Sequence, residues 1–137
     1  MKCSNMSSKN KFKLNSQQRN FLLYKADMLD SGTQLKGWKR FKSTYREMSA
    51  FYNIKAGIVL KKPKFILDHR TPVSLRVPTV KLGDGWVAQP LVRKTDLGKA
   101  LKTLKEDLRP YLKKGIFPDI HRGNVGWYDG KPLMFDW

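Results

Sequence analysis

Residues 118–137 read PDIHRGNVGWYDGKPLMFDW, and this stretch carries the strongest local signal in the chain. Asp129-Gly130 separates Val125–Tyr128 from the segment 131–135. An Asp-Gly pair between two apolar segments is typical of a two-residue β-hairpin turn. Pro132 in the second segment removes one backbone donor, which suggests a strand at the edge of a sheet. The sequence therefore predicts a hairpin here.

A two-residue turn fixes the register of the two predicted strands. Tyr128 then faces Lys131, and counting outward sets Phe135 opposite Asn124. Asp136 follows one step later, beside Asn124, although twelve positions separate these two residues in the chain. Directly opposed strand residues lie about 5 Å apart. An Asn amide oxygen and an Asp carboxylate are hard oxygen ligands of the kind that Mg²⁺ uses together with water and phosphate.

Asp119 precedes Asn124 by five residues, on the segment that leads into the hairpin. A carboxylate at this place could orient a hydroxyl group or a water molecule for attack on phosphorus. Arg122 and Lys131 are basic groups that could balance phosphate charge. The stretch thus predicts a site that handles phosphate groups.

DIHRGN followed by FDW resembles the catalytic loop and metal-binding segment of the protein-kinase-like superfamily, above all its aminoglycoside-phosphotransferase branch. The resemblance implies that Asp119 is the catalytic Asp and that His121 is the histidine of the same loop. It also implies that Asn124 and Asp136 bind the metal. The implied cofactors are ATP and Mg²⁺.

Upstream segments follow the order expected in that superfamily. The segment 78–92 is similar to the strand pair that precedes the kinase hinge, with Gln89 and Leu91 where the adenine edge is recognised. Leu97–Leu112 would match the long helix beneath the catalytic loop. The resemblance, with these segments included, covers roughly residues 55–137.

The phosphate-anchoring lysine of the superfamily has three candidates. Lys61, at the end of the apolar run from Gly57, is the first, Lys64 the second and Lys25 the third. Glu47 is the only Glu before residue 106, and therefore the only upstream Glu that could pair with such a lysine.

The chain also departs from the family pattern. Phe117 stands where many members have His, no clear glycine-rich loop precedes the sheet, and no activation segment follows Asp136. The implied fold is α+β, a small antiparallel sheet with packed helices. It would be a minimal kinase-like fold that ends after the catalytic hairpin.

The organisation expected from the pattern is a flexible basic tail over 1–14 and a single domain over 15–137. The domain divides into three ranges: helical 15–54, a sheet and hinge over 55–93, and a helix with the catalytic loop and hairpin over 94–137.

Two helices are predicted in the first range. Ser16 caps the first, which runs to about Asp30 and stops at Gly32. Phe21, Tyr24 and Met28 lie on one of its faces, with Leu22, Ala26 and Leu29 beside them. The second helix runs from about Leu35 to Tyr52, because aromatic residues recur there at spacings of three and four.

Short β-branched and aromatic runs predict strands near 57–60, 64–67 and 73–77, and Asp84-Gly85 predicts a further hairpin. A third helical segment begins at a possible cap, Asp96, and ends at Gly115. Pro110 would kink or split it.

The composition favours a polyanionic partner. The chain of 137 residues has 28 Lys and Arg against 11 Asp and Glu, a formal charge of +17. One cysteine excludes an internal disulfide, and two histidines argue against an ordinary zinc site. No transmembrane span and no signal peptide is visible, so a cytoplasmic location without membrane contact is expected.

Three functions remain open. The first is a minimal kinase-like enzyme that binds ATP and Mg²⁺ and transfers phosphate to a hydroxyl acceptor. The second is a catalytically inactive kinase-like module that binds or inhibits an acidic partner protein, or associates with itself through an exposed apolar floor. The third is a nucleic-acid-binding protein with a basic patch. That patch would consist of Lys61, Lys62, Lys64, Arg70 and Arg76.

Overall fold

The computed structural model describes residues 12–41, 49–62, 73–115 and 125–134. These belong to two compact units. The first consists of Met1–Phe65 and Pro78–Leu91, and the second of Ile66–Val77 and Val92–Trp137. The chain is an α+β protein with a small antiparallel sheet and two α-helices in the described ranges, which confirms the predicted fold class at this level.

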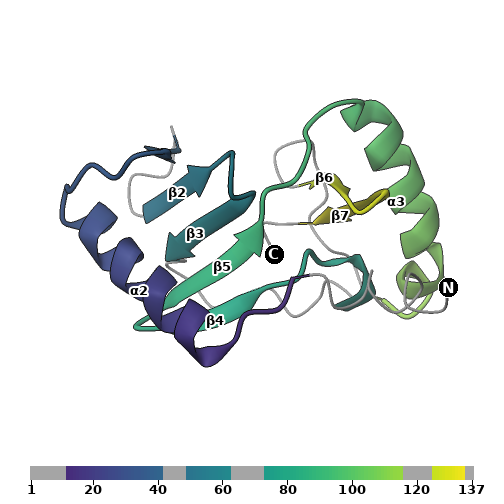
Figure 1. The fold of residues 1–137 in the computed structure, drawn as a ribbon. Coiled ribbons are helices and arrows are strands. Elements are labelled where there is room, and N and C mark those ends of the chain that lie inside the picture. Colours follow the sequence, from purple (N-terminus) through teal and green to yellow (C-terminus); the bar gives the residue numbers. More distant parts are fainter. Residues whose placement is uncertain (1–11, 42–48, 63–72, 116–124, 135–137) are drawn as a thin grey trace, which may run out of the picture. The chain divides into compact units, whose positions relative to one another are not determined.

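The first unit is built on a five-stranded antiparallel sheet in the order β1-β2-β3-β5-β4 (Figure 1). Its strands are β1 (Trp38–Arg40), β2 (Ser49–Asn53), β3 (Ile58–Lys62), β4 (Val80–Gly83) and β5 (Trp86–Pro90). The predicted Asp84-Gly85 hairpin is confirmed, since it joins β4 to β5. Both of its residues have positive φ, at 54° and 85°, as a type I′ turn requires.

The predicted helix over 35–52 is wrong in its described parts. Trp38–Arg40 and Ser49–Asn53 are strands that pair with each other, and residues 42–48 lie outside the described ranges. Phe51 packs beside Trp86 with ring centroids 6.3 Å apart. Helical periodicity is only a weak prior, and here pairing with β3 and packing into the sheet core override it.

Helix α2 (Ser16–Asp30) confirms the first predicted helix, but its cap is Asn15 rather than Ser16. The Asn15 side-chain oxygen accepts from the Gln18 N–H at 2.8 Å, and the Gln18 side chain accepts from the Asn15 N–H at 2.9 Å. This reciprocal pair is a capping box. The helix begins at Ser16, so the capping position belongs to the preceding residue, Asn15.

The predicted stop of α2 at Gly32 is confirmed. Gly32 has φ +98° and donates to the Leu29 carbonyl at 3.1 Å, while Thr33 donates to the Met28 carbonyl at 3.0 Å. These two bonds form a Schellman motif, which needs a left-handed residue after the helix.

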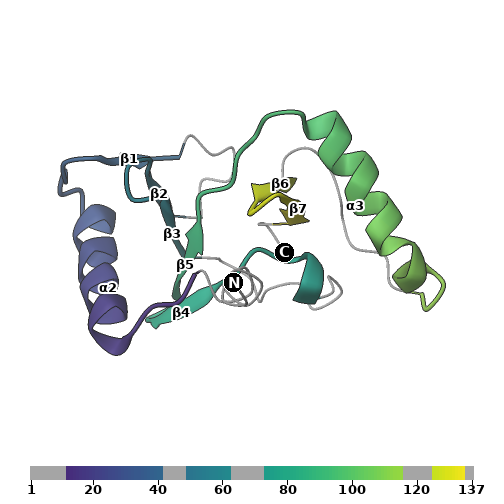
Figure 2. The same ribbon diagram turned by 45° about the vertical axis from the view of Figure 1, so that its right-hand side comes forward.

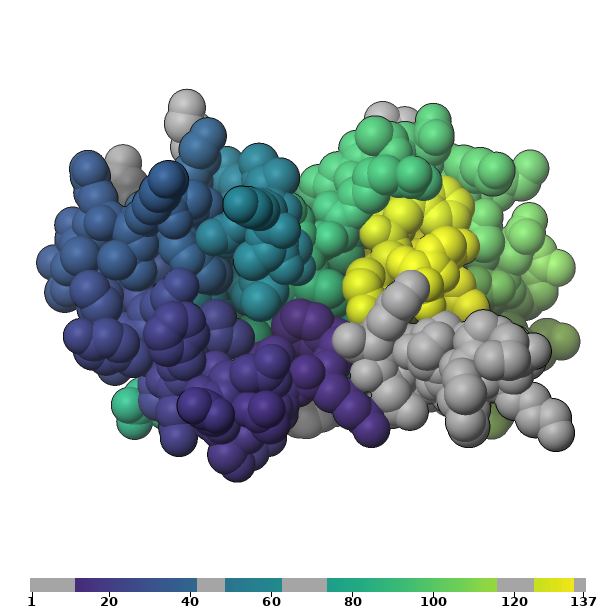
Figure 3. Space-filling model, viewed as in Figure 1, coloured from purple at the N-terminus to yellow at the C-terminus, as the bar shows by residue number. Residues whose placement is uncertain are grey.

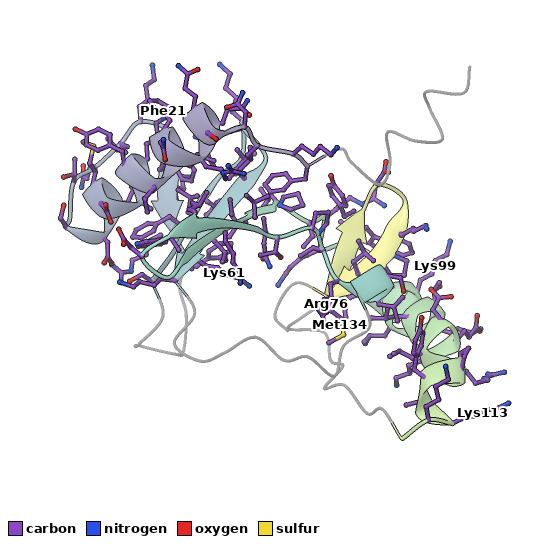
Figure 4. The ribbon with its side chains drawn as sticks, turned by 90° about the horizontal axis from the view of Figure 1, so that it is seen from below. Phe21, Lys61, Arg76, Lys99, Lys113 and Met134 are labelled. Atoms are coloured by element: carbon purple, nitrogen blue, oxygen red, sulfur yellow. The ribbon has the colours of Figure 1, made fainter. Side chains whose placement is uncertain are left out.

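Helix α2 lies against one face of the sheet (Figures 1 and 2). The core of this unit consists of Leu22, Ala26, Leu29, Phe51, Leu60, Leu82, Trp86 and Ala88. Because side chains alternate along a strand, Lys61 and Gln89 belong to the opposite face from Leu60 and Ala88. Figure 4 accordingly shows Phe21 of α2 and Lys61 on opposite sides of the sheet.

The second unit combines α3 (Leu97–Leu112) with a hairpin of β6 (Val125–Tyr128) and β7 (Lys131–Met134). Its core consists of Leu75, Leu104, Leu108, Val125 and Met134. Helix α3 contributes Leu104 and Leu108, one turn apart, which is the apolar spacing expected of a helix that covers a sheet.

The predicted strand over 73–77 is wrong at its start. Val73–Leu75 forms a short 3₁₀ helix, η1. Only Arg76 and Val77, which follow η1, bond to a strand. Arg76 forms an isolated parallel bridge with Met134, and the Val77 N–H donates to the Met134 carbonyl at 2.8 Å. The segment bonds to β7 at one point instead of extending a sheet.

Helix α3 begins where it was predicted, at Leu97 with Asp96 in the N-cap position, but it ends at Leu112 rather than at Gly115. Asp96 has φ +52° and makes no side-chain capping bond. Pro110 does not split the helix, which continues to Leu112. Gly115 ends the following turn, with φ +81° and an N–H bond to the Leu112 carbonyl at 3.1 Å. Pro110 has no N–H to donate to the carbonyl four residues earlier, but only Tyr111 and Leu112 follow it in the helix.

No helix within the described ranges has the length and apolar character needed to cross a bilayer.

Candidate functional site

The β6–β7 hairpin has the predicted register. Tyr128 pairs with Lys131, and Val125 pairs with Met134 at the far end. Asp129 and Gly130 form the turn with φ of 52° and 76°, again the positive values of a type I′ turn. The local sequence therefore determines which residues of the two strands face each other.

Pro132 leaves the hairpin ladder intact. It pairs with Trp127, one position from the closing pair, where backbone groups of a two-residue hairpin point away from the partner strand. Trp127 uses these outward groups to exchange two bonds with Arg93, each 2.9 Å long. The donor that Pro132 lacks therefore faces the outer edge of β7, as expected for a proline on an edge strand.

The four residues that the kinase resemblance assigns to catalysis and metal binding are Asp119, His121, Asn124 and Asp136. All four lie outside the described residues. Asn124 immediately precedes β6, and Asp136 follows the end of β7 by two positions. Within the described ranges, no group of three or more His, Cys, Asp or Glu side chains could hold a metal ion. The magnesium site stays a prediction that rests on Asn124 and Asp136.

Lys61 is a buried lysine on β3, which lies at the centre of the five-stranded sheet. Only 5% of its surface is exposed. Its register neighbours are Ala50 on β2 and Val87 on β5. Lys62, the next residue, is exposed. Removing an ammonium group from water is costly unless other groups compensate its charge, so burial distinguishes Lys61 from an ordinary surface lysine.

The other candidates for the phosphate anchor and its partner either lie outside the described residues or lie on the α2 side of the sheet. Lys64 and Glu47 lie outside the described residues. Lys25 is on α2, with its Nζ 4.5 Å from the centroid of the Phe21 ring. This places Lys25 on the α2 side of the sheet, away from Lys61.

Gln89 and Leu91, the residues predicted to meet the adenine edge, lie on β5 and directly after it. Gln89 is 2% exposed, and its side-chain amide donates to the Thr79 hydroxyl at 2.9 Å. The Leu91 N–H donates to the Gly57 carbonyl at 2.8 Å. A ligand that approached Leu91 through this N–H would therefore have to displace the Gly57 carbonyl.

The basic patch predicted for nucleic acid is not a single exposed surface in its described members. Lys61 is buried and cannot follow a phosphate backbone, while Lys62 is exposed. Arg76 belongs to the second unit. Lys64 and Arg70 lie outside the described residues. The sequence alone did not reveal that Lys61 and Lys62 differ in burial. They differ because adjacent strand residues point to opposite faces.

A groove in the second unit was not predicted. It has a volume of about 620 Å³ and lies between α3 and the turn end of the β6–β7 hairpin. Helix α3 lines it with Lys99, Thr103, Asp107 and Tyr111, and the hairpin contributes Trp127 and Lys131. The spacing of four along the helix is the signal that could have revealed this stripe.

No protein-family model matches this chain, and searches of curated proteins and of solved structures returned no match. The kinase-like resemblance therefore depends on the residues of the chain itself.

Proposed function

We propose that this protein is a minimal kinase-like phosphotransferase that binds ATP and Mg²⁺ and transfers phosphate to a hydroxyl acceptor. The observation that carries the proposal is the burial of Lys61 on the central strand of the antiparallel sheet, at 5% exposure. The sequence pattern independently makes Lys61 the first candidate for the phosphate anchor. A kinase holds its phosphate-binding lysine on a strand of this kind.

The chemistry of the residues fits a polyphosphate ligand. A buried ammonium group gains most from a charged acceptor, and a nucleotide phosphate supplies one. In the proposal Lys61 binds phosphate oxygens, while Gln89 and Leu91 border the base. The side chain of Lys62 is exposed and takes no part.

The proposed metal ligands are Asn124 and Asp136, which adjoin the paired strands β6 and β7 in the sequence. Bound Mg²⁺ would supply charge neutralisation at the phosphates. Asp119 orients the acceptor hydroxyl, and His121 belongs to the same loop. Catalysis in this proposal consists mainly of positioning and electrostatic stabilisation.

The test compares ATP affinity, with and without Mg²⁺, among the wild type, Lys61→Met and Lys62→Met. The two lysines are adjacent and differ in burial, so Lys62→Met is the matched control. A lost charge-assisted hydrogen bond corresponds to a weakening of roughly ten- to a hundredfold for Lys61→Met. The Lys62→Met variant should bind as the wild type does. Equal affinities of the two variants, with unchanged circular dichroism, would contradict the proposal.

Metal use and phosphate transfer are measured separately. Asp136→Ala should abolish the Mg²⁺ dependence of ATP binding. Labelled ATP, Mg²⁺ and a host lysate should yield a labelled acceptor with the wild type and none with Asp119→Ala. Binding of ATP without transfer by the wild type would instead indicate a non-catalytic nucleotide-binding module.

A further inference from the structure

The outer side of α2 exposes two aromatic rings. Phe21 is 57% exposed and Tyr24 is 63% exposed, although the same helix buries Leu22, Ala26 and Leu29 in the sheet core. Phe21 and Tyr24 are three residues apart, so they lie on neighbouring turns of one face. Figure 3 shows the side chains of α2, coloured purple to blue, at the surface of the first unit, and Figure 4 shows Phe21 away from the sheet.

A cation lies beside these rings. The Lys25 Nζ is 4.5 Å from the centroid of the Phe21 ring and 6.0 Å from that of Trp38 on β1. Both distances are within the range in which a cation and an aromatic face attract each other. Trp38 is half-buried and packs against the sheet core, so it anchors Lys25 beside the exposed ring of Phe21.

The strand next to this cluster adds positive charge. Arg40 on β1 is exposed and belongs to the same face of the sheet as Trp38, and it lies 5.4 Å from the centroid of the Phe51 ring. Acidic groups are also present on α2, namely Asp27 and Asp30, and Asp30 accepts a hydrogen bond from the Ser49 hydroxyl at 2.6 Å. By helical spacing, Asp30 lies apart from Phe21 and Lys25 around the helix, while Asp27, three residues after Tyr24, is a neighbour of that ring.

We propose that this surface binds single-stranded nucleic acid, with bases stacked on the exposed rings and phosphates bound by the cations. We call it the α2–β1 surface, and it comprises Phe21, Tyr24, Lys25, Trp38 and Arg40. Each nucleotide offers one aromatic base and one negative charge, and the surface offers rings and cations side by side. Proteins that bind single strands without sequence preference combine these two features.

The charge of the whole chain favours this partner. The formal charge of +17 attracts a polyanion over a long range, and the α2–β1 surface adds the ring faces that a simple electrostatic contact lacks. The surface lies on the side of the sheet opposite Lys61, so it is separate from the proposed phosphate anchor (Figure 4). Failure of either proposal therefore leaves the other standing.

The test measures the affinity of the full chain for oligo(dT) and oligo(U) of about 12 nucleotides, within the usual range of site sizes. Fluorescence anisotropy of an end-labelled oligonucleotide at several salt concentrations is a suitable readout. The double variant Phe21→Ala/Tyr24→Ala should bind about tenfold or more weakly than the wild type, with an unchanged salt slope, because it loses stacking and no charge. The matched control is Ile54→Ala, another exposed apolar residue of the same unit at 68% exposure.

Loss of charge should have the complementary effect. Lys25→Gln/Arg40→Gln removes two cations, and the slope of log affinity against log salt should become shallower by about 1.4, since each phosphate contact with a single strand contributes about 0.7. Phe21, Tyr24 and Arg40 are exposed and Lys25 is half-buried, and none belongs to the buried core, so far-UV circular dichroism should be the same for every variant.

Two results would overturn the proposal. Equal affinity of the ring variant and Ile54→Ala would mean that the chain attracts nucleic acid only through its net charge. Binding of poly-Glu as tight as that of oligo(dT), with the same loss in the ring variant, would assign the surface to an acidic protein.

Discussion

Replacing Gly126 by Ala should strongly destabilise the second unit. Gly126 lies on β6, beside the segment of Val92 and Arg93, and Arg93 forms an antiparallel bridge with the adjacent Trp127. A Cβ atom at Gly126 would be 2.4 Å from the Val92 Cγ2, 2.8 Å from the Val92 Cβ and 3.2 Å from the Arg93 carbonyl oxygen. Carbon atoms in contact normally lie about 3.5–4.0 Å apart. Rotation of Val92 would relieve only the first of these contacts, because its Cβ is fixed to the backbone.

The magnitude follows from the backbone bonds next to this contact. Separating the two segments by about 1 Å, enough to restore a normal carbon contact, would break the two 2.9 Å bonds between Arg93 and Trp127. Two lost bonds cost about 1–3 kcal/mol, and overpacking of a filled site costs about 1–3 kcal/mol. The expected loss in the free energy of unfolding is therefore about 2–6 kcal/mol.

Urea unfolding, followed by both far-UV circular dichroism and tryptophan fluorescence, measures this loss. The double variant Gly126→Ala/Val92→Gly removes the opposing Cγ2 and Cβ and should recover part of the stability, so the two substitutions should couple by about 1 kcal/mol or more. A loss below about 0.5 kcal/mol for Gly126→Ala, or an absence of coupling with Val92→Gly, would refute the reasoning.

Two further predictions concern the ends of local elements. Asn15→Ala should lower the free energy of unfolding by about 1 kcal/mol because it removes the capping box of α2. The control is Gln17→Ala, at an exposed position without a capping bond, which should have little effect. Urea unfolding midpoints compare the two variants, and equal midpoints would count against the cap. Gly130→Ala should destabilise the β6–β7 hairpin by about 1 kcal/mol because φ is +76° there, and Gly130→Asn should lose less, since Asn adopts left-handed backbone more readily. The opposite ranking of the Ala and Asn variants in thermal melts would show that turn strain is not the cause.

Much of the local structure could be predicted because it depends on residues that are neighbours in the chain. The Asp84-Gly85 and Asp129-Gly130 turns need only a left-handed backbone at two adjacent positions, and the turn then fixes the strand register. Helix α2 and its stop at Gly32 follow from the same kind of short-range signal.

The failed predictions concern residues whose partners are distant in the sequence. The aromatic spacing around Trp38 and Phe51 fits a helix, yet β1 and β2 form because they pair with each other and with β3. Asp96 occupies the predicted N-cap position of α3, and only its left-handed backbone and the missing side-chain bond were not expected. For the candidate site, the order of the elements along the chain and the register of β6 with β7 were predictable from the sequence. The burial of Lys61 was not, because it depends on how strands pack.

The sequence by itself therefore determined the two tight turns, the extent of α2 and the register of β6 with β7, since all of these follow from backbone preferences over a few residues. Tertiary structure alone decided that Lys61 is buried while Lys62 is exposed, and that α2 buries Leu22, Ala26 and Leu29 while it exposes Phe21 and Tyr24. The physical reason is that burial depends on which face of an element meets the rest of the sheet. That choice minimises the exposed apolar surface of the whole unit rather than of any one segment.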